Sequence, residues 1–399
     1  MGFRTLDDVD PCGQRVLVRV DFNVPMEDGR ITDDTRLRAA LPTIEELRAK
    51  GARVILLSHF DRPKGRRVDS MSLGPLAAPL SKLLGAPVAF ADDCIGQPAL
   101  EAVRKLGAGD VLLLENLRFH AGEETNEPSL ARELAKLGDL YVDDAFSTAH
   151  RAHASTEAIA HLLPACAGRS MQTELEHLEK ALGSPERPVM GIVGGAKVST
   201  KLELLDNLVT KLDRLAIGGG MANTFRFAQG YDVGASLCEK DMAETAREII
   251  GKAQAANCQL LLPTDVVVAK KLEPDGDSRV TELGKIAADE SIFDVGPNSL
   301  AHILDAIEDS KTLVWNGPLG VFEVPPFDRG TLEAARCAAR LAKSGQLVAV
   351  AGGGDTVAAL NAAGAADDFT FVSTAGGAFL EWMEGKTLPG VAALEDEAT

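Results

Sequence analysis

The 399-residue sequence has no apolar run that approaches the roughly 20 residues needed to cross a membrane. Its first ten residues, MGFRTLDDVD, also lack the apolar stretch of a secretory leader. Leu6 stands where a myristoylation signal requires Ser or Thr. We therefore expect a cytoplasmic protein that is neither inserted into a membrane nor anchored to one.

Cysteines are few, and none of the six lies in a C-x-x-C pair. In a chain of this length, scattered cysteines are typical of reduced, mostly buried thiols in a reducing compartment. His150 and His153, in the run HRAH, have no matching Cys or His cluster that would complete a zinc site, so we expect none there. The cysteines are Cys12, Cys94, Cys166, Cys238, Cys258 and Cys337.

A surplus of positive charge is also missing. The 41 Lys and Arg residues stand against 59 Asp and Glu residues, which gives a formal net charge of −18. Nucleic acids and anionic membranes both require a basic surface, so neither is expected as a partner. A small anionic substrate remains compatible with this balance, provided that cationic side chains gather locally.

What the sequence does contain is a regular alternation of short apolar runs and longer amphipathic segments. The runs are apolar on both alternating faces, as parallel strands are when helices cover both sides of a sheet. The length favours two domains, so we predict an α/β protein with doubly wound parallel sheets. The predicted strands are Arg15–Val20, Arg53–Ser58, Val111–Leu114, Tyr141–Val142, Val189–Val193, Leu215–Ile217, Leu260–Leu262, Leu313–Trp315, Leu347–Val350 and Phe369–Val372. The predicted helices include Arg36–Lys50, Ser199–Lys211 and Asp241–Ala256.

A domain boundary is indicated near residues 170–188. The segment QTELEHLEKAL is typical of an exposed helix with patterned charges, and the breaker-rich segment GSPERP follows it. We therefore predict a first domain over residues 1–171, a connecting helix and hinge over 172–187, and a second domain over 188–379.

Polar side chains follow four of the predicted strands in the first half, where ligands of open α/β sheets bind. In an acidic protein, arginines gathered at one sheet edge predict a local positive field for a multiply charged anion, since the planar guanidinium binds carboxylate and phosphate bidentately. Taken singly, each arginine is more often a surface residue, and the Asp and Asn are ordinary turn residues. The residues concerned are Asp21, Asn23, Arg36, His59, Arg62, Arg118 and Arg151.

In the second half, the strand MGIV leads into GGAKVSTK. Gly194 and Gly195 let a ligand approach the backbone closely, and the helix N-terminus that follows favours phosphate. Lys197 and Lys201 are four residues apart, so we expect them on one face of a helix with an anion between them. The alternative is two solvated lysines. The segment is not a Walker P-loop, because Val198 follows the lysine where Ser or Thr is required.

The turns GGGMANTF, AGGGDT and STAGGAF also follow predicted strands. Each begins a helix with free backbone N–H groups, and several such turns at one sheet edge indicate a nucleotide site. Asp355, in AGGGDT, is either a Mg²⁺ ligand or the cap of the next helix. Asn316 and Glu323, after the strand TLVW, lie near the same predicted edge.

At this point the chain resembles the phosphoglycerate kinase family of glycolysis, gluconeogenesis and the Calvin cycle, along essentially its whole length. The segments RVDFNVP, HRAHAST, GGAKV, GGGMA, WNGPLGVFE and AGGGDT occur in the family's order. The resemblance implies two Rossmann-like lobes joined by a helix and hinge, with the C-terminal segment 380–399 packing back on the first lobe. It also implies a monomer whose lobes close around the reactants.

The activity that this resemblance implies is reversible transfer of the acyl phosphate of 1,3-bisphosphoglycerate to MgADP, which gives 3-phosphoglycerate and MgATP. The first lobe would bind the phosphoglycerate through Asp21, Phe22, Asn23, Arg36, His59, Phe60, Asp61, Arg62, Arg118 and Arg151. The second lobe would bind ATP or ADP through Lys197, Lys201, Gly219, Gly220, Asn316, Glu323, Gly353, Gly354, Asp355 and Thr356.

The resemblance also implies roles for some of these residues. Arg36, Lys197 and Lys201 would contact the migrating phosphoryl group. Backbone N–H groups near Gly353 and Gly376 would assist. The Mg²⁺ ion that accompanies the nucleotide would be held by Asp355.

Four positions depart from the family's common pattern. Asp61 replaces the glycine of HLGRP, and an acid there would weaken anion binding if it pointed inward. Ser147 and Ala375 also replace glycines, and Ala375 matters only if its position needs a positive φ. Asn223 replaces an aromatic residue near the base pocket. None of the four removes a charged catalytic position.

Two other functions are compatible with an α/β chain rich in glycine turns. A nicotinamide dehydrogenase would need G-x-G-x-x-G after the first strand, where this chain has DFNVP. A non-catalytic nucleotide-binding protein would bind ADP without turnover, and the retained Arg36, Lys197, Lys201 and Asp355 argue against it.

Overall fold

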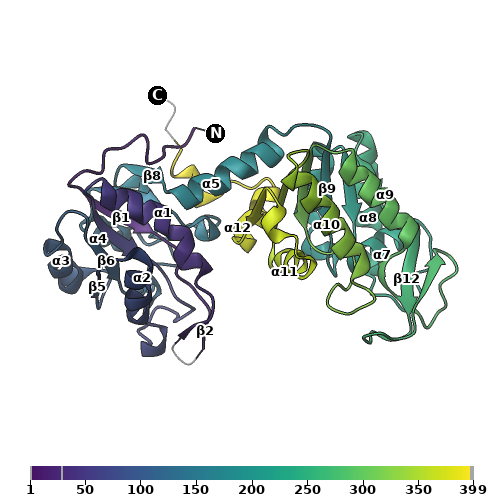
Figure 1. Ribbon diagram of the computed structural model, residues 1–399, viewed down its shortest axis with the longest axis horizontal. Coiled ribbons are helices and arrows are strands. Elements are labelled where there is room, and N and C mark those ends of the chain that lie inside the picture. Colours follow the sequence, from purple (N-terminus) through teal and green to yellow (C-terminus); the bar gives the residue numbers. More distant parts are fainter. Residues whose placement is uncertain (1, 28–29, 396–399) are drawn as a thin grey trace. The chain divides into compact units, whose positions relative to one another are not determined.

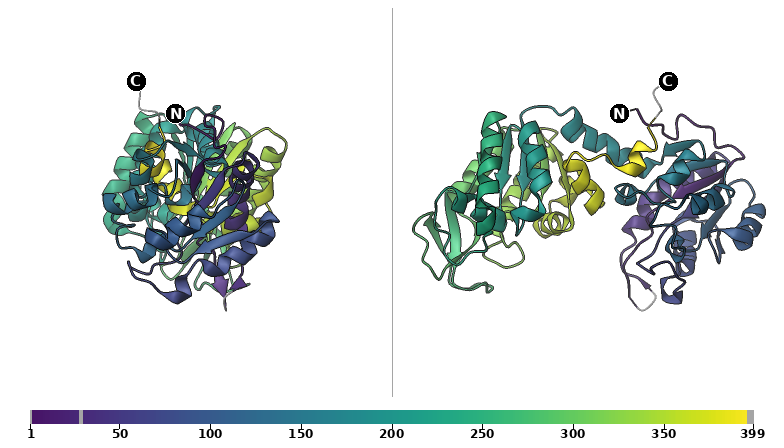
Figure 2. Two further views of the ribbon diagram at one scale, coloured as in Figure 1. Left: turned by 90° about the vertical axis from the view of Figure 1, so that its left-hand side faces the viewer. Right: turned by 180° about the vertical axis from the view of Figure 1, so that it is seen from behind.

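The computed structural model describes residues 2–27 and 30–395 and separates the chain into two compact units (Figure 1). Unit 1 consists of Met1–Leu175 with Thr387–Thr399, and unit 2 consists of Glu176–Lys386. Each unit is built around one six-stranded sheet with helices packed against its faces (Figures 1 and 2). The predicted α/β class with two doubly wound parallel sheets is confirmed.

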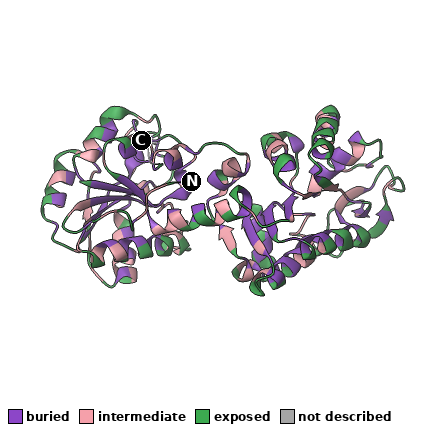
Figure 3. Ribbon diagram, turned by 90° about the horizontal axis from the view of Figure 1, so that it is seen from above, coloured by how far each residue is buried: buried purple, intermediate pink, exposed green. Residues whose placement is uncertain are grey.

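The sheet of unit 1 has the strand order β5-β6-β4-β1-β7-β8, and all its pairings are parallel. Its central strands are apolar on both faces because helices cover each side, and their side chains are almost entirely buried (Figure 3). The strands are β1 (Arg15–Arg19), β4 (Arg53–Leu57), β5 (Val88–Ala91), β6 (Val111–Leu114), β7 (Leu140–Asp143) and β8 (Ala165–Ala167). The helices are α1 (Thr35–Ala49), α2 (Ala77–Leu84), α3 (Gly96–Arg104) and α4 (Pro128–Ala135), and β2 (Met26–Glu27) pairs with β3 (Arg30–Ile31).

The large sheet of unit 2 has the order β11-β10-β9-β15-β16-β17 and is also parallel throughout. Its strands are β9 (Val189–Val193), β10 (Arg214–Ile217), β11 (Gln259–Leu261), β15 (Thr312–Asn316), β16 (Val348–Gly352) and β17 (Phe371–Ser373). The helices are α6 (Leu202–Lys211), α7 (Gly219–Ala228), α8 (Ala243–Ala255), α9 (Pro297–Glu308), α10 (Arg329–Lys343), α11 (Gly354–Ala363) and α12 (Gly376–Met383). A core around Trp315 fills the space between this sheet and its helices.

The ten predicted strands all form, with ends that differ by at most two residues, but seven further strands among the described residues were not predicted: β2, β3, β5, β8 and three that form a sheet of their own. The strands β5 and β8 are short. The strands β12 (Asp265–Ala269), β13 (Arg279–Glu282) and β14 (Ser291–Val295) form a separate antiparallel sheet in unit 2. The strand β13 is exposed at three of its four positions, unlike the continuous apolar runs from which the others were predicted.

The predicted boundary segment forms α5 (Arg169–Leu178), which continues into a π-helical turn at Glu179–Gly183. Compact packing divides the chain after Leu175, within α5. Asp144 accepts hydrogen bonds from the backbone N–H groups of Ser170 and Met171, at 2.8 and 3.2 Å, and so caps the start of this helix.

The C-terminal segment expected over 380–399 divides between the units. Residues up to Lys386 belong to unit 2, where Asn207 donates to the Met383 carbonyl oxygen at 2.5 Å. The short helix α13 (Pro389–Ala392) packs in unit 1, and Gly390 N–H donates to the Ala149 carbonyl oxygen at 2.9 Å. Residues 396–399 of the expected segment lie outside the described residues.

None of the helices in the described parts of the chain combines the length and the apolar character needed to cross a membrane. Four of the six cysteines are buried, Cys238 is intermediate and Cys12 is exposed. This agrees with the prediction of mostly buried thiols.

Candidate active site

The carboxyl ends of β1, β4, β6 and β7 bring most of the predicted first-half residues to one edge of the unit 1 sheet. Arg36, in the first turn of α1, donates from Nη1 to Asp21 Oδ2 at 2.8 Å and to the Asn23 carbonyl oxygen at 2.9 Å. Ser147 also donates to Asp21 Oδ2, at 2.6 Å. Asp21 therefore fixes the position of the Arg36 guanidinium.

The loop after β4 is tied to its neighbours through the backbone of Asp61. Asp61 N–H donates to Asn23 Oδ1 at 2.9 Å, and its carbonyl oxygen accepts from Arg118 Nη1 at 2.8 Å. Asp61 has a φ of +54°, which explains why glycine suits this position. The residue is exposed to solvent. Arg62 is exposed as well, and no ion pair involves it within residues 2–27 and 30–395.

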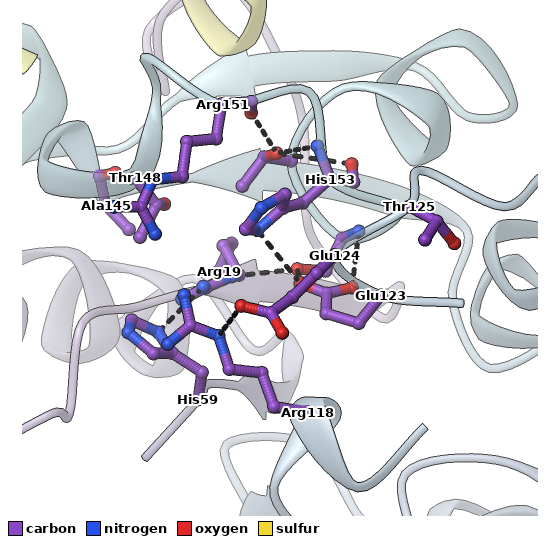
Figure 4. Close-up of polar contacts among 12 residues, drawn as sticks. Arg19, His59, Arg118, Glu123, Glu124, Thr125, Ala145, Thr148, Arg151 and His153 are labelled. Atoms are coloured by element: carbon purple, nitrogen blue, oxygen red, sulfur yellow. Dashed lines mark hydrogen bonds and ion pairs between the residues drawn. The ribbon is translucent and has the colours of Figure 1, made fainter. Parts of the chain in front are cut away.

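Arg118 and His59 lie in the buried part of this cluster (Figure 4). Burial lowers the pKa of Arg118, and the Glu124 carboxylate, 3.4 Å from its Nε, opposes that shift. Burial also holds the pKa of His59 well below its usual range, and the positive charges of Arg19, Arg118 and Arg36 reinforce the shift. His59 is therefore neutral near pH 7, and the positive field comes from the arginines.

The remaining predicted residues of this lobe differ in burial. Phe22 is fully buried and donates its backbone N–H to Ser58 Oγ at 2.9 Å. Phe60 is partly buried, and its N–H donates to Asn116 Oδ1 at 3.1 Å. Arg151 is exposed, with Nε 3.0 Å from Nε2 of His150.

A buried network beneath the cluster was not assigned from the sequence. Arg19 is fully buried, donates to Ser155 Oγ at 2.9 Å and lies 3.0 Å from His59 Nδ1. Ser155 donates in turn to Glu123 Oε1 at 2.5 Å. Burial lowers the pKa of His153 to about 4, so this histidine is also neutral. A charged residue inside the apolar strand VLVRV was the sequence signal for Arg19, because arginine is almost never fully buried without partners.

In unit 2, two glycine turns pack back to back at the ends of β9 and β15. A Cβ on Gly194 would lie 1.7 Å from the Pro318 carbonyl oxygen, and one on Gly317 would lie 2.2 Å from the Gly194 carbonyl oxygen. No side chain fits at either position. The backbone is therefore held close to the sheet edge here.

Lys201 reaches this pair of turns. Its Nζ donates to the Gly194 carbonyl oxygen at 2.7 Å and to Asn316 Oδ1 at 2.6 Å. Burial lowers the pKa of Lys201 to about 8, although the nearby Asp355 carboxylate opposes the shift. Among the described residues, this ammonium has only neutral hydrogen-bond partners.

The prediction that Lys197 and Lys201 share a helix face is wrong. Lys197 has an extended backbone and precedes a 3₁₀ turn at Val198–Thr200, and α6 begins only at Leu202. Lys197 is exposed, whereas Lys201 is partly buried. The glycine-rich start of the segment keeps the chain out of the α conformation until after Lys201.

A cavity of about 370 Å³ opens at the same edge. Its lining includes the predicted residues Gly219, Gly220, Glu323 and Asp355. It also includes Asn223, whose amide donates to the Leu237 carbonyl oxygen at 3.1 Å, and apolar residues that the sequence did not indicate: Leu237, Pro263, Ile292, Phe293 and Leu319. Glycine turns on one side and apolar side chains on the other suit a ligand with a phosphate end and a flat apolar end.

Other predicted residues stand behind the cavity rather than in its lining. Asn316 donates to the Gly352 carbonyl oxygen at 2.9 Å, and Thr356 Oγ1 accepts from Gly317 N–H at 2.7 Å. Gly353, with φ +98°, precedes α11, and Gly376 is the first residue of α12. Ala375 has a φ of −87°, so alanine replaces glycine there without strain.

One glycine at the start of α11 and one in α8 make a matched test of this backbone. We expect Gly353→Ala to lower kcat/KM for ATP at least about tenfold, because its Cβ would lie 2.7 Å from Asn316 Nδ2 at a φ that side chains avoid. Gly251→Ala, at an exposed position of α8 that was not assigned to the site, meets no atom within 4 Å and should stay within about twofold of wild type. Steady-state kinetics and the melting temperatures of both variants measure this, and equal behaviour of the two would contradict it.

The structure also brings together a group of residue types that can bind metal ions. Asp93, Cys94 and His120 come together in unit 1, and it is the one such group found among the described residues. His120 Nε2 already lies 2.7 Å from Asp93 Oδ1, and burial raises the pKa of the Cys94 thiol well above its usual value. A protonated thiol is a poor metal ligand.

The comparisons with known proteins fit this geometry. The phosphoglycerate kinase family model matches residues 6–386. A phosphoglycerate kinase of Caulobacter vibrioides is 68% identical over 395 residues, which cover 99% of this chain and 100% of that protein. One of Bradyrhizobium diazoefficiens is 63% identical over 392 residues, 98% of each chain. The solved phosphoglycerate kinase of Coxiella burnetii superposes with a TM-score of 0.94, at 43% identity and full coverage of both chains.

The chain belongs to the phosphoglycerate kinase family.

It is therefore an enzyme, a kinase that transfers phosphate from 1,3-bisphosphoglycerate to ADP, and the resemblance drawn from its motifs is confirmed. Its substrates are small molecules, one of them a nucleotide. The dehydrogenase and the non-catalytic alternatives have no support from these relatives. The departures at Asp61, Ser147, Asn223 and Ala375 all lie within residues 6–386, which the family model matches.

Proposed function

We propose that unit 1 binds the phosphoglycerate and unit 2 binds ADP or ATP. The observation that carries the first assignment is the set of arginines gathered at one sheet edge of a chain with net charge −18. Arg36 and Arg118 are held there by Asp21 and by the Asp61 backbone. Their neighbours His59 and His153 are neutral, so the site attracts anions without a proton-transfer group of its own.

The second assignment is supported by the 370 Å³ cavity beside the glycine turns of unit 2. Phosphate groups would lie at the starts of α7 and α11, where backbone N–H groups are unpaired within the helix. The base would lie against the apolar wall that includes Leu237, which is 55% exposed in the free protein. Burial of that side chain by the base would add to the affinity.

In the transfer, a β-phosphate oxygen of ADP attacks the phosphorus of the acyl phosphate, and the bond from phosphorus to the carboxyl oxygen breaks. The products are the carboxylate of 3-phosphoglycerate and ATP. Such a reaction needs positioning and charge stabilisation more than a general base. Arg36, Lys197 and Lys201 are the cations proposed to stabilise the migrating group, with backbone N–H groups near Gly353 and Gly376.

The substrate assignment is tested by two exposed arginines of one loop. We expect Arg62→Ala to raise KM for 3-phosphoglycerate about tenfold, since charge-assisted hydrogen bonds contribute about 1.5–3 kcal/mol, and to leave KM for ATP unchanged. Arg66→Ala is the control, because Arg66 is also exposed and was not assigned to the site. An assay coupled to glyceraldehyde-3-phosphate dehydrogenase, with loss of NADH absorbance, measures both constants. Equal effects of the two substitutions would overturn the assignment.

Magnesium would accompany the nucleotide, and Asp355 fits it. The carboxylate is exposed in the first turn of α11, lines the cavity, and makes no hydrogen bond or ion pair with the described residues. A free carboxylate oxygen is the kind of ligand that Mg²⁺ prefers. When bound, the ion would neutralise phosphate charge.

We expect EDTA to abolish turnover and Asp355→Asn to raise the Mg²⁺ concentration for half-maximal activity about tenfold or more. Asp241→Asn, which changes an exposed acid in another helical first turn of unit 2, should leave that concentration unchanged. A magnesium titration of the wild-type, Asp355→Asn and Asp241→Asn enzymes measures this concentration. An Asp355→Asn enzyme with the wild-type magnesium requirement would remove this residue from the metal site.

We further propose that the protein is a cytoplasmic monomer without nucleic-acid or membrane partners. Its net charge of −18 supports the absence of such partners, because both require a basic surface. Closure of the lobes around both reactants stays a prediction.

A further inference from the structure

A second cavity, of about 410 Å³, lies in unit 2 at the free edge of the six-stranded sheet. It is bounded by β11, which is the edge strand, and by residues of α7, α8 and α9. Pro263 is the one residue that lines both this cavity and the nucleotide cavity. The volume lies within the range of small-molecule sites.

The charge of this edge cavity is unusual for the chain. The protein has 59 Asp and Glu residues, yet none of them lines the cavity, whereas Arg226 and His302 do. Arg226 is the one permanently charged side chain in the lining, so no carboxylate of the wall cancels its positive potential, and Asp265, to which Ser299 donates, lies behind the wall. That potential favours an anion.

Arg226 is half-buried and has only neutral partners. Its Nε donates to the Pro263 carbonyl oxygen at 2.6 Å, its Nη2 to the Leu262 carbonyl oxygen at 2.7 Å, and its Nη1 to Gln229 Oε1 at 2.8 Å. Burial lowers its pKa, and no carboxylate in the described parts of the chain lies within ion-pair distance. Each Nη atom keeps one N–H, so two donors remain for a single anionic group.

The rest of the wall is suited to an apolar body. Ile250, Leu260 and Ile303 contribute aliphatic side chains from three different elements. The backbone of β11 adds polar groups. Gln259 N–H donates to the Asp213 carbonyl oxygen at 2.8 Å, toward the inside of the sheet. The backbone N–H and carbonyl groups of the next residue, Leu260, therefore point to the open edge. A ligand in this place meets one cation, an apolar wall and an unpaired strand edge.

We propose that the edge cavity is a second ligand site, which binds a small organic monoanion with an apolar body, its carboxylate or sulfonate on Arg226. A polyphosphate does not fit this description, because a single guanidinium with two free N–H groups matches one anionic group. The site shares only Pro263 with the lining of the nucleotide cavity, and Arg226 was assigned to neither substrate site.

The test uses 8-anilinonaphthalene-1-sulfonate, which joins a sulfonate to aromatic rings and fluoresces in apolar surroundings. The nucleotide cavity is first saturated with MgADP, so that fluorescence reports the remaining sites. We expect one saturable site to persist under this condition. Loss of all binding on addition of MgADP would overturn the proposal, because the probe would then occupy the nucleotide cavity alone.

Three substitutions locate the probe. Gln254→Glu places a carboxylate at an exposed position of the cavity wall with almost no change of shape, and it should raise the probe Kd about tenfold. Gln346→Glu makes the same change at an exposed position of unit 2 outside the cavity and should leave Kd unchanged. Arg226→Met should raise Kd by at least tenfold as well. Equal Kd values for the two Gln→Glu variants would overturn the proposal even if the Arg226→Met protein does not fold.

Discussion

Replacement of Lys201 by alanine is expected to lower kcat by about 10²-fold or more, the usual consequence of removing a preorganised donor from a charged transition state. The ammonium is already positioned by the Gly194 and Asn316 oxygens, at 2.7 and 2.6 Å, so little reorganisation accompanies the reaction. Its partners are neutral, which leaves the charge available for a phosphoryl group. Burial makes the interaction stronger than it would be in water.

The same burial gives the reaction a pH dependence. The pKa of Lys201 is lowered to about 8, so the cation is present below that pH and is lost as the pH rises through it. We therefore expect kcat/KM for ATP, which reports the free enzyme, to be flat up to about pH 8 and to fall above it. Lys211→Ala, which removes an exposed lysine at the end of α6, is the control and should keep the wild-type rate and profile. Near-normal turnover of Lys201→Ala would exclude the proposed role.

The fold could be predicted because its strongest signal is local. Runs such as VLVRV and RVILL are apolar on both faces, as parallel strands are when helices cover both sides of the sheet. Segments long enough to form helices separate successive runs. The antiparallel sheet of β12, β13 and β14 gives no such signal. The strand β13, with the sequence RVTE, is mostly exposed, and its pairing with β12 depends on tertiary packing rather than on its own composition.

Residues at strand ends could also be predicted, because a parallel sheet places all its carboxyl ends at one edge. Side-chain roles could not. The spacing of Lys197 and Lys201 suggested one helix face, but the 3₁₀ turn between them places Lys197 in solvent and Lys201 against Asn316. Leu237 and Pro263 line the nucleotide cavity from segments far from any glycine motif, and only the folded chain shows it.

Replacement of Arg36 by alanine should have an effect of the same size in unit 1, a loss of about 10²-fold or more in kcat. Asp21 and the Asn23 carbonyl oxygen both bind Nη1 and hold the guanidinium in place, while Nη2 and Nε make no hydrogen bond with the described residues. Those free N–H groups point to a role with the transferred group rather than in folding. Arg36→Lys should recover only part of the rate, because an ammonium keeps the charge but loses the planar fork.

The neighbouring residue Arg38 provides the matched control, since it lies on the same helix and its guanidinium is paired with Asp34 at 2.8 Å in an exposed i,i+4 bridge. Bridges of this kind contribute about 0.3–0.5 kcal/mol, so Arg38→Ala should retain both rate and stability. The informative result is a loss of kcat in Arg36→Ala together with an unchanged melting temperature. A loss of melting temperature with kcat preserved would instead make Arg36 a structural partner of Asp21, and the cation at the migrating phosphoryl group would have to come from another arginine of the cluster.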